Sequence, residues 1–444
     1  MGVCCQKLED PEEDVFMGNR GDMKITVLGL WHLGSVTAAC CAQHFRVVGL
    51  DYNAGIVRDL AAGKAPLFEP GLDDLLAEGL TKGSLSFTED ASAACAGADV
   101  LWVCADTPVN EQDISDVAAV LVPLRKTLPH LVPGTLVLVS SQLPVGTCAK
   151  LEAEFPAFQF ACCPENLRLG GAIKVFTDAD RYVLGIRSEQ PRPLLEKLFA
   201  PFTQQLLFMR PESAEMVKHA LNSFLAASIT FINEIATVCE WVGADAKEVS
   251  AGLKSDIRIG PKAYLGPGGP FAGGTLARDV VTLTGIGESR GETLELIPAI
   301  KRSNDNHRGW ARRRLLAHFK DLAGRRISLI GLTYKAGTDT LRRSAAVELG
   351  QALAAAGAHV RSWDPVVKEL PPGLEALGLV HSLEEAAEDA EVMVVGTEWP
   401  VLLDADWEQI LPRMRTPVLV DANRFLERRL GGQPGVKILS VGRI

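Results

Sequence analysis

The stretch that decides the fold is Met23 to Asp51, which reads MKITVLGLWHLGSVTAACCAQHFRVVGLD. It begins with an apolar run rich in β-branched residues, KITVLGL, passes through a helical segment, and returns to a second apolar run, FRVVGLD. Short buried strands that alternate with helices are typical of βαβ units, in which helices cover both faces of a parallel sheet. The stretch therefore predicts the start of a doubly wound α/β domain.

The loop between this first strand and its helix has the spacing of a dinucleotide-binding turn. Gly29 and Gly34 stand at the tight turn and at the helix–strand contact, and Asp51 follows the next strand, where an acid binds ribose hydroxyls. Trp31 replaces the glycine that lets the backbone approach a pyrophosphate. We expect NAD to bind here in preference to NADP, because Asp51 repels a 2′-phosphate; the alternative is that Trp31 only packs on a domain interface.

The same alternation continues outward to about Arg210 and resumes at Arg326 with RISLIGLTYK. Between them, Ser213 to Ala244 has apolar residues at helical spacing nearly all round and no proline, which predicts one long buried helix. The fold class is therefore α/β, with two Rossmann-like doubly wound domains joined by a long central helix. We expect a disordered leader at 1–22, an NAD domain at 23–210, a central helical region at 211–310 and a second Rossmann-like domain at 311–444.

Composition excludes several classes of protein. A chain of 444 residues with 47% hydrophobic residues is too long for one core and sufficient for two or three. A net charge of −10 predicts no binding to nucleic acid or anionic membrane, and interrupted apolar runs predict no membrane span. No secretory signal is present, so we expect a cytoplasmic protein. The ten cysteines lack zinc-site spacing and predict no metal site, while lipidation at Gly2 or Cys4 is an alternative for the leader.

The order of the motifs resembles that of one enzyme family. The chain carries FEPGLDDLL, TPVNEQD, SQLPVGT, PENLRLGGAIK, EMVKHALNSFLA, DIRIGPKAYLGPG, GPGGPFAGGTLARD, YKAGTDTLRRS and DANRF in sequence. This set is similar to that of the UDP-glucose/GDP-mannose dehydrogenase family. The resemblance implies an NAD domain, a central dimer-forming region and a C-terminal domain that binds a UDP-sugar substrate, in a homodimer.

The resemblance also implies catalytic residues for oxidising an alcohol to a carboxylate. Glu165 matches the family's general base for water, and Asp279 matches an aspartate that supports base chemistry. Lys218 and Asn222 lie four residues apart on one helix face, so that both can address an oxyanion on C6. The plainer alternatives are a solvated loop carboxylate for Glu165 and an ion pair with Arg278 for Asp279.

The chain departs from the family where the nucleophile belongs. Thr275 occupies the position of the family's Cys, and a threonine hydroxyl is barely ionised at neutral pH, whereas Cys is partly thiolate. Gln142 replaces a Thr that orients water, and Leu169 replaces a Glu four residues after the general base. Cys162 or Cys163 as a relocated nucleophile is an alternative, although buried strand cysteines are usually inert.

The residues that the resemblance assigns to nucleotide-sugar binding lie in loops. The resemblance places Arg258 across the dimer against the sugar, and the glycine-rich run that includes Gly268 leaves room for a pyrophosphate. Lys335 and Arg342 match basic residues at the domain cleft, where charge-assisted bonds to phosphates of the substrate and the cofactor are expected. Thr107 ends a strand on the carboxyl side of the first sheet, where ligands bind in open α/β folds; otherwise it belongs to an ordinary loop.

Three functions fit these residues. The first is oxidation of C6 of a UDP-hexose by two NAD, with UDP-glucose favoured over N-acetylmannosamine sugars by the PENLRLGG and EPGLDDLL blocks. The second is an altered activity that stops at the aldehyde, oxidises its hydrate slowly, or uses transient oxidation for epimerisation. The third is a catalytically silent nucleotide-sugar binder with a regulatory role.

Overall fold

The computed structural model describes residues 23–110, 112–164, 167–272 and 274–443. The expected leader at 1–22 lies outside these residues. The chain forms two compact units: the first ends at Lys218 and omits Val109–Ser115, and the second comprises Val109–Ser115 and the chain from His219 onward.

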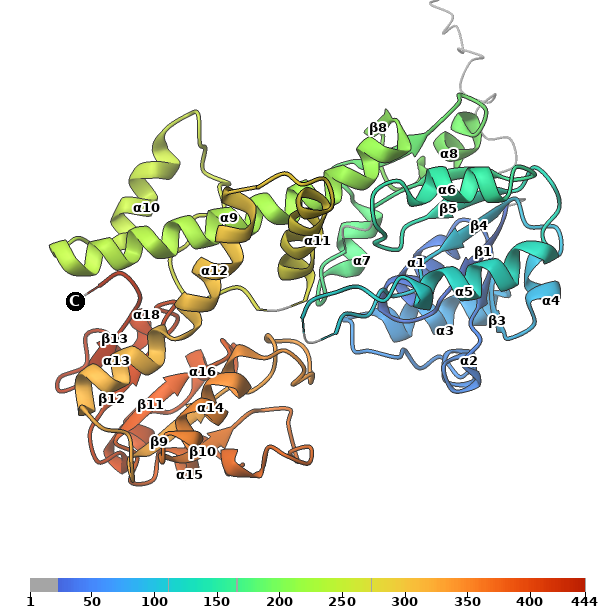
Figure 1. Ribbon diagram of the computed structural model, residues 1–444. Helices are drawn as coiled ribbons and strands as arrows, with labels where there is room; N and C mark the ends of the chain where they lie inside the picture. Colours follow the sequence, from blue (N-terminus) through green and yellow to red (C-terminus); the bar gives the residue numbers. More distant parts are fainter. Residues whose placement is uncertain (1–22, 111, 165–166, 273, 444) are drawn as a thin grey trace, which may run out of the picture. The chain divides into compact units, whose positions relative to one another are not determined.

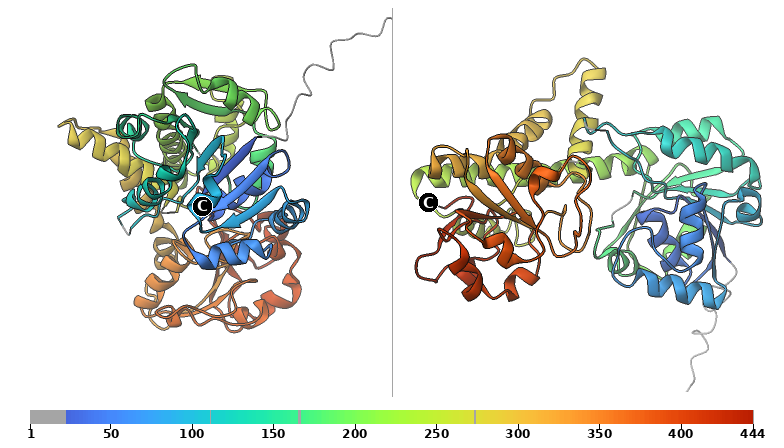
Figure 2. Two further views of the ribbon diagram at one scale, coloured as in Figure 1. Left: turned by 90° about the vertical axis from the view of Figure 1, so that its right-hand side faces the viewer. Right: turned by 90° about the horizontal axis from the view of Figure 1, so that it is seen from below.

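The first unit contains an eight-stranded sheet in the order β3-β2-β1-β4-β5-β6-β7-β8. Its first six strands have the 3-2-1-4-5-6 order of a dinucleotide-binding fold. All neighbours are parallel except β6 and β7, which pair antiparallel and extend the sheet beyond the doubly wound part. Figure 2 shows the strands of this sheet side by side in its left-hand view. The strands are β1 Lys24–Leu28, β2 Arg46–Leu50, β3 Leu85–Thr88, β4 Val100–Val103, β5 Leu136–Val139, β6 Gln159–Cys162, β7 Tyr182–Ile186 and β8 Leu206–Met209.

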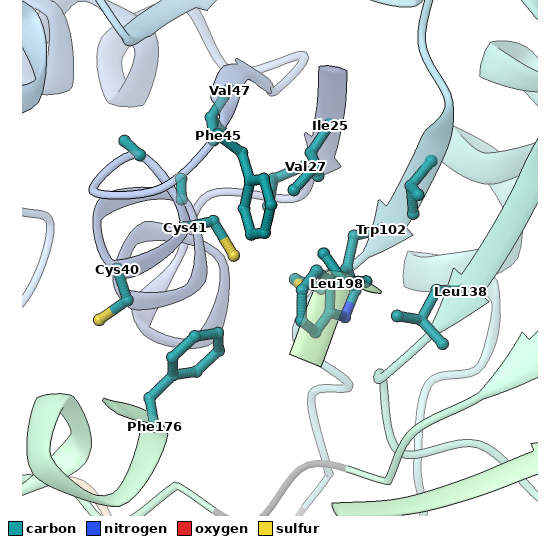
Figure 3. Packing of buried hydrophobic residues seen from close by; sticks show 14 of the residues in the cluster. Ile25, Val27, Cys40, Cys41, Phe45, Val47, Trp102, Leu138, Phe176 and Leu198 are labelled. Atoms are coloured by element: carbon teal, nitrogen blue, oxygen red, sulfur yellow. The ribbon is translucent and has the colours of Figure 1, made fainter. Parts of the chain in front are cut away.

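Alternation along the central strands divides the core of this unit into two layers. Ile25, Val27 and Trp102 point into one cluster, whereas Leu101 and Val103 point into another on the opposite face. A strand buried on both faces needs apolar residues at consecutive positions, which explains runs such as VLWV in β4. Figure 3 shows the first cluster, where Cys41 and Phe45 point toward the sheet residues Ile25 and Val27.

The helices of this unit complete both layers. Residues of α1, α3, α7 and α8 join the first cluster, and residues of α4, α5 and α6 join the second. The cysteines of the described part of the chain are all buried and none forms a disulfide, as expected for small core residues. The helices are α1 His32–Cys41, α2 Ala54–Ala61, α3 Leu72–Lys82, α4 Ala91–Cys95, α5 Ala118–Thr127, α6 Thr147–Glu154, α7 Ala172–Thr177 and α8 Arg192–Phe199.

The predicted long helix is α9, Pro211–Val242, which leaves the first unit and enters the second (Figure 1). At its start Glu215, buried in the first unit, accepts hydrogen bonds from the backbone N–H groups of Gly146 and Cys148. By length and composition α9 could cross a membrane, but core helices of soluble proteins pass the same test. Three of its ionisable residues, Glu215, His219 and Glu240, are buried within the protein.

The second unit begins with a helical layer around α9. Phe271, Ala277 and Ile300 pack with Ala226 of α9 into a small core of their own. The helices are α10 Ala246–Ser255, α11 Thr275–Ser289, α12 Leu296–Arg308 and α13 Trp310–Phe319.

A five-stranded parallel sheet in the order β10-β9-β11-β12-β13 follows, which is the 2-1-3-4-5 order of a doubly wound fold. Here too the strands are buried on both faces: Leu329 and Val394 point into one cluster, and Ile330 and Met393 into another. The strands are β9 Arg326–Ile330, β10 His359–Trp363, β11 Val392–Val395, β12 Val418–Val420 and β13 Lys437–Leu439. The helices are α14 Ala345–Ala355, α15 Leu383–Ala387, α16 Val401–Asp404, α17 Trp407–Ile410 and α18 Glu427–Leu430. The predicted architecture of two Rossmann-like sheets and one long helix is confirmed.

Candidate functional site

The cofactor loop of the first unit has room only for glycine at two of its positions. A Cβ on Gly29, which has φ +87°, would lie 2.4 Å from the Cα of Ala105, and one on Gly34 would lie 1.7 Å from the carbonyl oxygen of Gly29. The strand β1 and the helix α1 therefore approach as closely as in a dinucleotide-binding turn. The N–H groups of the first turn of α1 have no partner within the helix, so they can bind an anion.

Asp51 holds this loop from the end of β2. Its Oδ2 accepts the backbone N–H of Leu30 at 2.8 Å, and its Oδ1 accepts that of Asn53 at 2.9 Å. Each oxygen keeps a lone pair for a ribose hydroxyl. Trp31 is the N-cap of α1, with φ −69° and a side chain that is 42% exposed, so an indole is accommodated there without backbone strain. These residues fit NAD, for which Gly29 and Gly34 would adjoin the pyrophosphate and Asp51 the adenosine ribose.

A buried carboxylate that the sequence did not single out also contacts this loop. Glu69 is 4% exposed, and one of its oxygens lies 2.9 Å from Nε2 of His32 in the first turn of α1. It also accepts the backbone N–H groups of Gly170 and Ala172, both at 2.8 Å. Glu69 therefore joins the cofactor helix to the segment that follows Glu165 in sequence. Glu165 itself lies outside the described residues.

The other candidates of the first unit lie at or after the ends of its strands, and Leu169 lies in the segment between β6 and α7. Thr107 is buried shortly after β4, and Gln142 and Leu169 are half-buried. Cys162 and Cys163 are each 3% exposed, and Sγ of Cys162 lies 3.5 Å from the carbonyl oxygen of Pro211. Thiols this deeply buried are poor nucleophiles, so the geometry does not favour either as a replacement for the missing Cys.

In the second unit, Asp279 lies at the centre of a buried polar cluster between α9 and α11. Its side chain has no exposed surface. Nδ1 of His219 lies 2.9 Å from Oδ1, and the side-chain amide of Asn222 donates to Oδ2. The adjacent Arg278 is more distant, with Nε 3.9 Å from Oδ1. The sequence left an ion pair with Arg278 as the alternative for Asp279, whereas both of these short contacts come from α9.

His219 is therefore a site residue that sequence reasoning missed. It stands between Lys218 and Asn222, and residues three apart on a helix share a face, so His219 and Asn222 both reach Asp279. Lys218, half-buried, lies four residues before Asn222 on α9, as expected. The signal was present in KHALN, where a histidine interrupts an apolar helix.

Thr275 begins α11, one turn before Asp279, and its side chain is exposed. The preceding residue, Gly274, donates its backbone N–H to Oδ1 of Asp113 at 3.1 Å. Asp113 is 5% exposed and also pairs with the guanidinium of Arg343. Both Asp113 and Arg343 have positive φ, near +61° and +62°, which non-glycine residues adopt only where the surroundings hold them. This ion pair, also missed from sequence, fixes the entry into the Thr275 helix.

Beside Thr275 the second unit encloses a pocket of about 1150 Å³. The glycine-rich loop forms one wall, and the ends of β9 and β11 form another, where strand order reverses. Open α/β folds bind their ligands at such a reversal. Gly268 and Lys335 both line this pocket, as does Thr275, so three sequence-predicted residues meet there.

Two buried asparagines, an exposed one and a buried histidine hold the pocket loop. Asn233 accepts the N–H of Gly268 at 3.0 Å, Asn423 accepts that of Gly269 at 2.6 Å, and Asn304 accepts that of Phe271 at 2.9 Å. A Cβ on Gly268 would lie 1.9 Å from Oδ1 of Asn423, so a side chain there would displace the amide of Asn423. Nε2 of His307 lies 2.7 Å from the carbonyl oxygen of Gly268, and burial lowers the pKa of His307, so the neutral ring donates Nε2–H. These hydrogen bonds hold the glycine-rich loop in one conformation.

The two remaining arginines lie apart from this pocket lining. Arg342 donates to the carbonyl oxygen of Val109 at 3.1 Å, within the segment Val109–Ser115. The side chain of Arg258 is 85% exposed and pairs with Asp256. Among the residues that the structure describes, no group of three or more His, Cys, Asp or Glu could hold a metal ion.

Comparison with known proteins divides the chain into three domains. Residues 23–203 match the NAD binding domain of the UDP-glucose/GDP-mannose dehydrogenase family, 212–306 its central domain, and 328–428 its UDP binding domain. The UDP-glucose 6-dehydrogenase of Rhizobium meliloti is 34% identical over 437 residues, which are 95% of this chain and 100% of that protein. TuaD of Bacillus subtilis, also a UDP-glucose 6-dehydrogenase, is 31% identical over 95% of this chain and 93% of its own.

Solved structures are similar to this chain over nearly its whole length. A UDP-glucose dehydrogenase from Pyrobaculum islandicum has a TM-score of 0.85 and 29% identity, covering 96% of this chain and 99% of that one. A UDP-D-ManNAc dehydrogenase from Pyrococcus horikoshii has a TM-score of 0.82 and 26% identity, covering 95% and 99%. The match of all three domains, together with the dinucleotide loop and the second Rossmann-like sheet, means that this chain belongs to the UDP-glucose/GDP-mannose dehydrogenase family and is an NAD-dependent nucleotide-sugar dehydrogenase.

Proposed function

We propose that this protein oxidises C6 of a UDP-hexose, with UDP-glucose as the substrate, and that its second oxidation is impaired. The observation that carries the proposal is the start of α11. Thr275 lies beside the pocket and one turn before Asp279, whose carboxylate is bonded by Asn222. This is the arrangement of a dehydrogenase site in which a hydroxyl stands in the place of a thiol.

Each site residue has a separate role in the proposed oxidation. Lys218 and Asn222 stabilise the alkoxide formed at C6, and Glu165 and Asp279 support the removal of protons from substrate and water. When bound, NAD accepts one hydride in each oxidation; Gly29, Gly34, Asp51, Thr107 and Arg342 hold it. Gly268 and Lys335 receive the diphosphate, and Arg258 reaches the sugar of a partner protomer.

Thr275 decides how far the reaction proceeds. In a family enzyme with Cys, a thioester forms from the aldehyde and the second hydride leaves from a covalent adduct. A neutral hydroxyl is a far weaker nucleophile than a thiolate, so the aldehyde must be oxidised as its hydrate. The second hydride transfer is then slower than the first, and aldehyde accumulates.

The experiment counts NADH. With limiting UDP-glucose and excess NAD, we expect fewer than two NADH per sugar at the time when the first phase ends. Thr275→Cys raises uronate formation, because it restores a nucleophile, whereas Thr275→Ser, the matched control, retains a hydroxyl and leaves the ratio unchanged. Two NADH released at equal rates by the wild type contradict the proposal. If Thr275→Cys has no effect, Trp31 or Gln142 limits the reaction first.

A silent nucleotide-sugar binder is the second candidate, favoured by the indole at Trp31 and the absence of the thiol. Calorimetric titration separates the two, since an enzyme binds NAD and a scaffold without cofactor shows no heat at millimolar NAD. UDP-N-acetylmannosamine serves as the competing substrate in the same assay.

Assignments that follow from the family pattern complete the proposal. We assign NAD binding to residues 23–210, a central helical and dimer-forming role to 211–310, and UDP-sugar binding to 311–444. We propose a homodimer in the cytoplasm, which cell fractionation and sedimentation test.

A further inference from the structure

The pocket of the second unit is lined by more positive than negative side chains, and its two carboxylates among the described residues have different surroundings. Glu348, exposed on α14, pairs with Arg308, whereas Glu398 is half-buried just after β11. The charged side chains along the pocket are Lys254, Arg308, Arg312, Lys335, Glu348 and Glu398. Such a lining suits an anionic ligand, and a carboxylate beside a phosphate would repel it. Glu398 therefore marks a part of the pocket where the ligand offers neutral hydrogen-bond donors.

Neighbouring contacts fix the backbone on both sides of Glu398. The hydroxyl of Thr397 donates to the carbonyl oxygen of Thr333, which follows β9, at 2.5 Å. Nε1 of Trp399 donates to Oδ2 of Asp364, which follows β10, at 3.1 Å. Because the sheet holds the residues before and after it, the side chain of Glu398 starts from a fixed position, which lowers the entropic cost of binding a ligand.

Glu398 is also joined to the pocket loop through Asn423. The amide oxygen of Asn423 accepts the backbone N–H of Gly269 at 2.6 Å, and its side chain forms a hydrogen bond with Glu398. Burial raises the pKa of Glu398 above its ordinary value and the charge of Asp421 adds to this rise, although Asn423 and the charge of Lys247 oppose it. A carboxylate in such surroundings is stabilised by a further donor from a ligand.

The position of Glu398 in the chain indicates which part of the substrate supplies that donor. Glu398 and Asn423 lie within the part of the chain that matches the UDP binding domain, whereas Thr275, where the proposed function places C6, lies within the match to the central domain. A uridine offers neutral donors in its ribose hydroxyls and in the N–H of its ring. Carboxylate oxygens accept hydrogen bonds from both kinds of group.

We propose that Glu398 is a specificity-determining residue of the substrate pocket, which accepts a hydrogen bond from the nucleoside of the UDP-sugar. The proposal rests on the proposed function, since it assigns one residue of the same pocket to one part of the same substrate. The donor is a ribose hydroxyl or the ring N–H, and analogues of UDP that lack one donor each distinguish these sources.

The test measures the binding of UDP, 2′-deoxy-UDP, 3′-deoxy-UDP and 3-methyl-UDP by calorimetric titration. We expect Glu398→Leu, which has no acceptor, to bind UDP about ten- to hundredfold more weakly than the wild type, the range of one hydrogen bond to a charged group. The wild type discriminates by a similar factor against the analogue that lacks the donor. Glu398→Leu binds that analogue as well as UDP, because the two partners of one contact are not additive. The analogue whose discrimination is lost identifies the ribose or the ring as the donor.

Two further variants complete the test. Glu408→Gln, at an exposed position of α17, is the control for loss of a carboxylate and matches the wild type. Glu398→Gln keeps the size of the side chain and one acceptor, so it shows a smaller loss in the same comparison and replaces Glu398→Leu if the latter does not fold. Equal discrimination by the wild type and the Glu398 variants overturns the proposal. Tighter binding of UDP after loss of the charge also overturns it, because the carboxylate then faces phosphate.

Turnover separates this proposal from the proposed function. A wild type that shows the discrimination but oxidises no UDP-sugar contradicts the proposed function and supports the role of Glu398. A wild type that oxidises UDP-glucose without any discrimination that depends on Glu398 contradicts only that role. If Glu398→Leu binds UDP normally and UDP-glucose weakly, the hexose supplies the donor and the proposal is wrong. A wild type that binds no UDP contradicts both.

Discussion

At the scale of single residues, Trp31 is the departure that most directly affects the cofactor. Its φ of −69° is open to every residue type, so no backbone strain forces a glycine there, and the indole is 42% exposed at the N-terminus of α1. A pyrophosphate at that terminus must share the space with the indole. The loop can thus retain NAD while binding it less tightly than a loop with the second glycine.

We expect Trp31→Gly to bind NAD about tenfold more tightly, equivalent to about 1.4 kcal/mol, because the indole no longer restricts access to the helix N-terminus. The glycine adds freedom to the unfolded chain, but it is also a favoured residue at a helix N-cap, so the free energy of unfolding changes by less than about 1 kcal/mol. Calorimetric titration measures the affinity. Trp31→Ala, which removes the indole without that freedom, must also tighten binding; unchanged affinity in both variants means that the indole lies outside the NAD path.

At the scale of elements, the segment Val109–Ser115 holds the start of α11. It is closed by a bridge between Val109 and Ser115, and Asp113 contacts both Gly274 and Arg343. Two non-glycine residues at positive φ, Asp113 and Arg343, meet in this one ion pair. Such conformations persist where neighbouring contacts stabilise them, and they cluster at functional sites.

The ion pair between Asp113 and Arg343 gives a prediction of stability. Asp113→Asn or Arg343→Gln each lower the free energy of unfolding by about 1–3 kcal/mol, because the buried Asp113 or the half-buried Arg343 loses its opposite charge. The double variant loses less than the sum, as a double-mutant cycle by urea unfolding shows. Glu196→Gln removes the exposed pair with Arg192 and changes stability by about 0.5 kcal/mol or less. Additive losses at Asp113 and Arg343 contradict the coupling.

At the scale of the whole molecule, α9 and the segment after α10 expose large apolar side chains. Phe224 is 72% exposed, Trp241 75% and Ile257 96%. Large exposed apolar side chains are frequent at protein–protein interaction surfaces. They support the proposed homodimer, in which a second copy covers them.

Sedimentation velocity tests the dimer. We expect the wild type to sediment as a dimer and Phe224→Glu or Trp241→Glu to shift it toward monomer, because each places a charge in the apolar contact. Val122→Glu, at an exposed position of α5 in the first unit, is the matched control and leaves the sedimentation unchanged. A monomeric wild type rules out this surface as the contact. Variants that still sediment as dimers with either α9 substitution also rule it out.

The local sequence was sufficient for the architecture. β-branched runs buried on both faces, glycines at Gly29 and Gly34, and a proline-free apolar stretch specify their elements through contacts close in sequence. The prediction that Lys218 and Asn222 lie on one face of a helix followed from the 3.6-residue periodicity of the helix alone. The antiparallel pairing of β6 with β7 was not foreseen, because strand direction depends on the path of the connection and not on the residues of the strand.

The sequence by itself determined the two Rossmann-like lobes, the long helix, the dinucleotide loop and the replacement of Cys by Thr275, since each is a matter of residue type and spacing. Only the tertiary structure decided the partners: His219 with Asp279, separated by 60 positions, Glu69 with Gly170, and Asp113 with Arg343. The physical reason is that a buried charge takes the nearest donor in space, and packing between distant segments sets which donor that is.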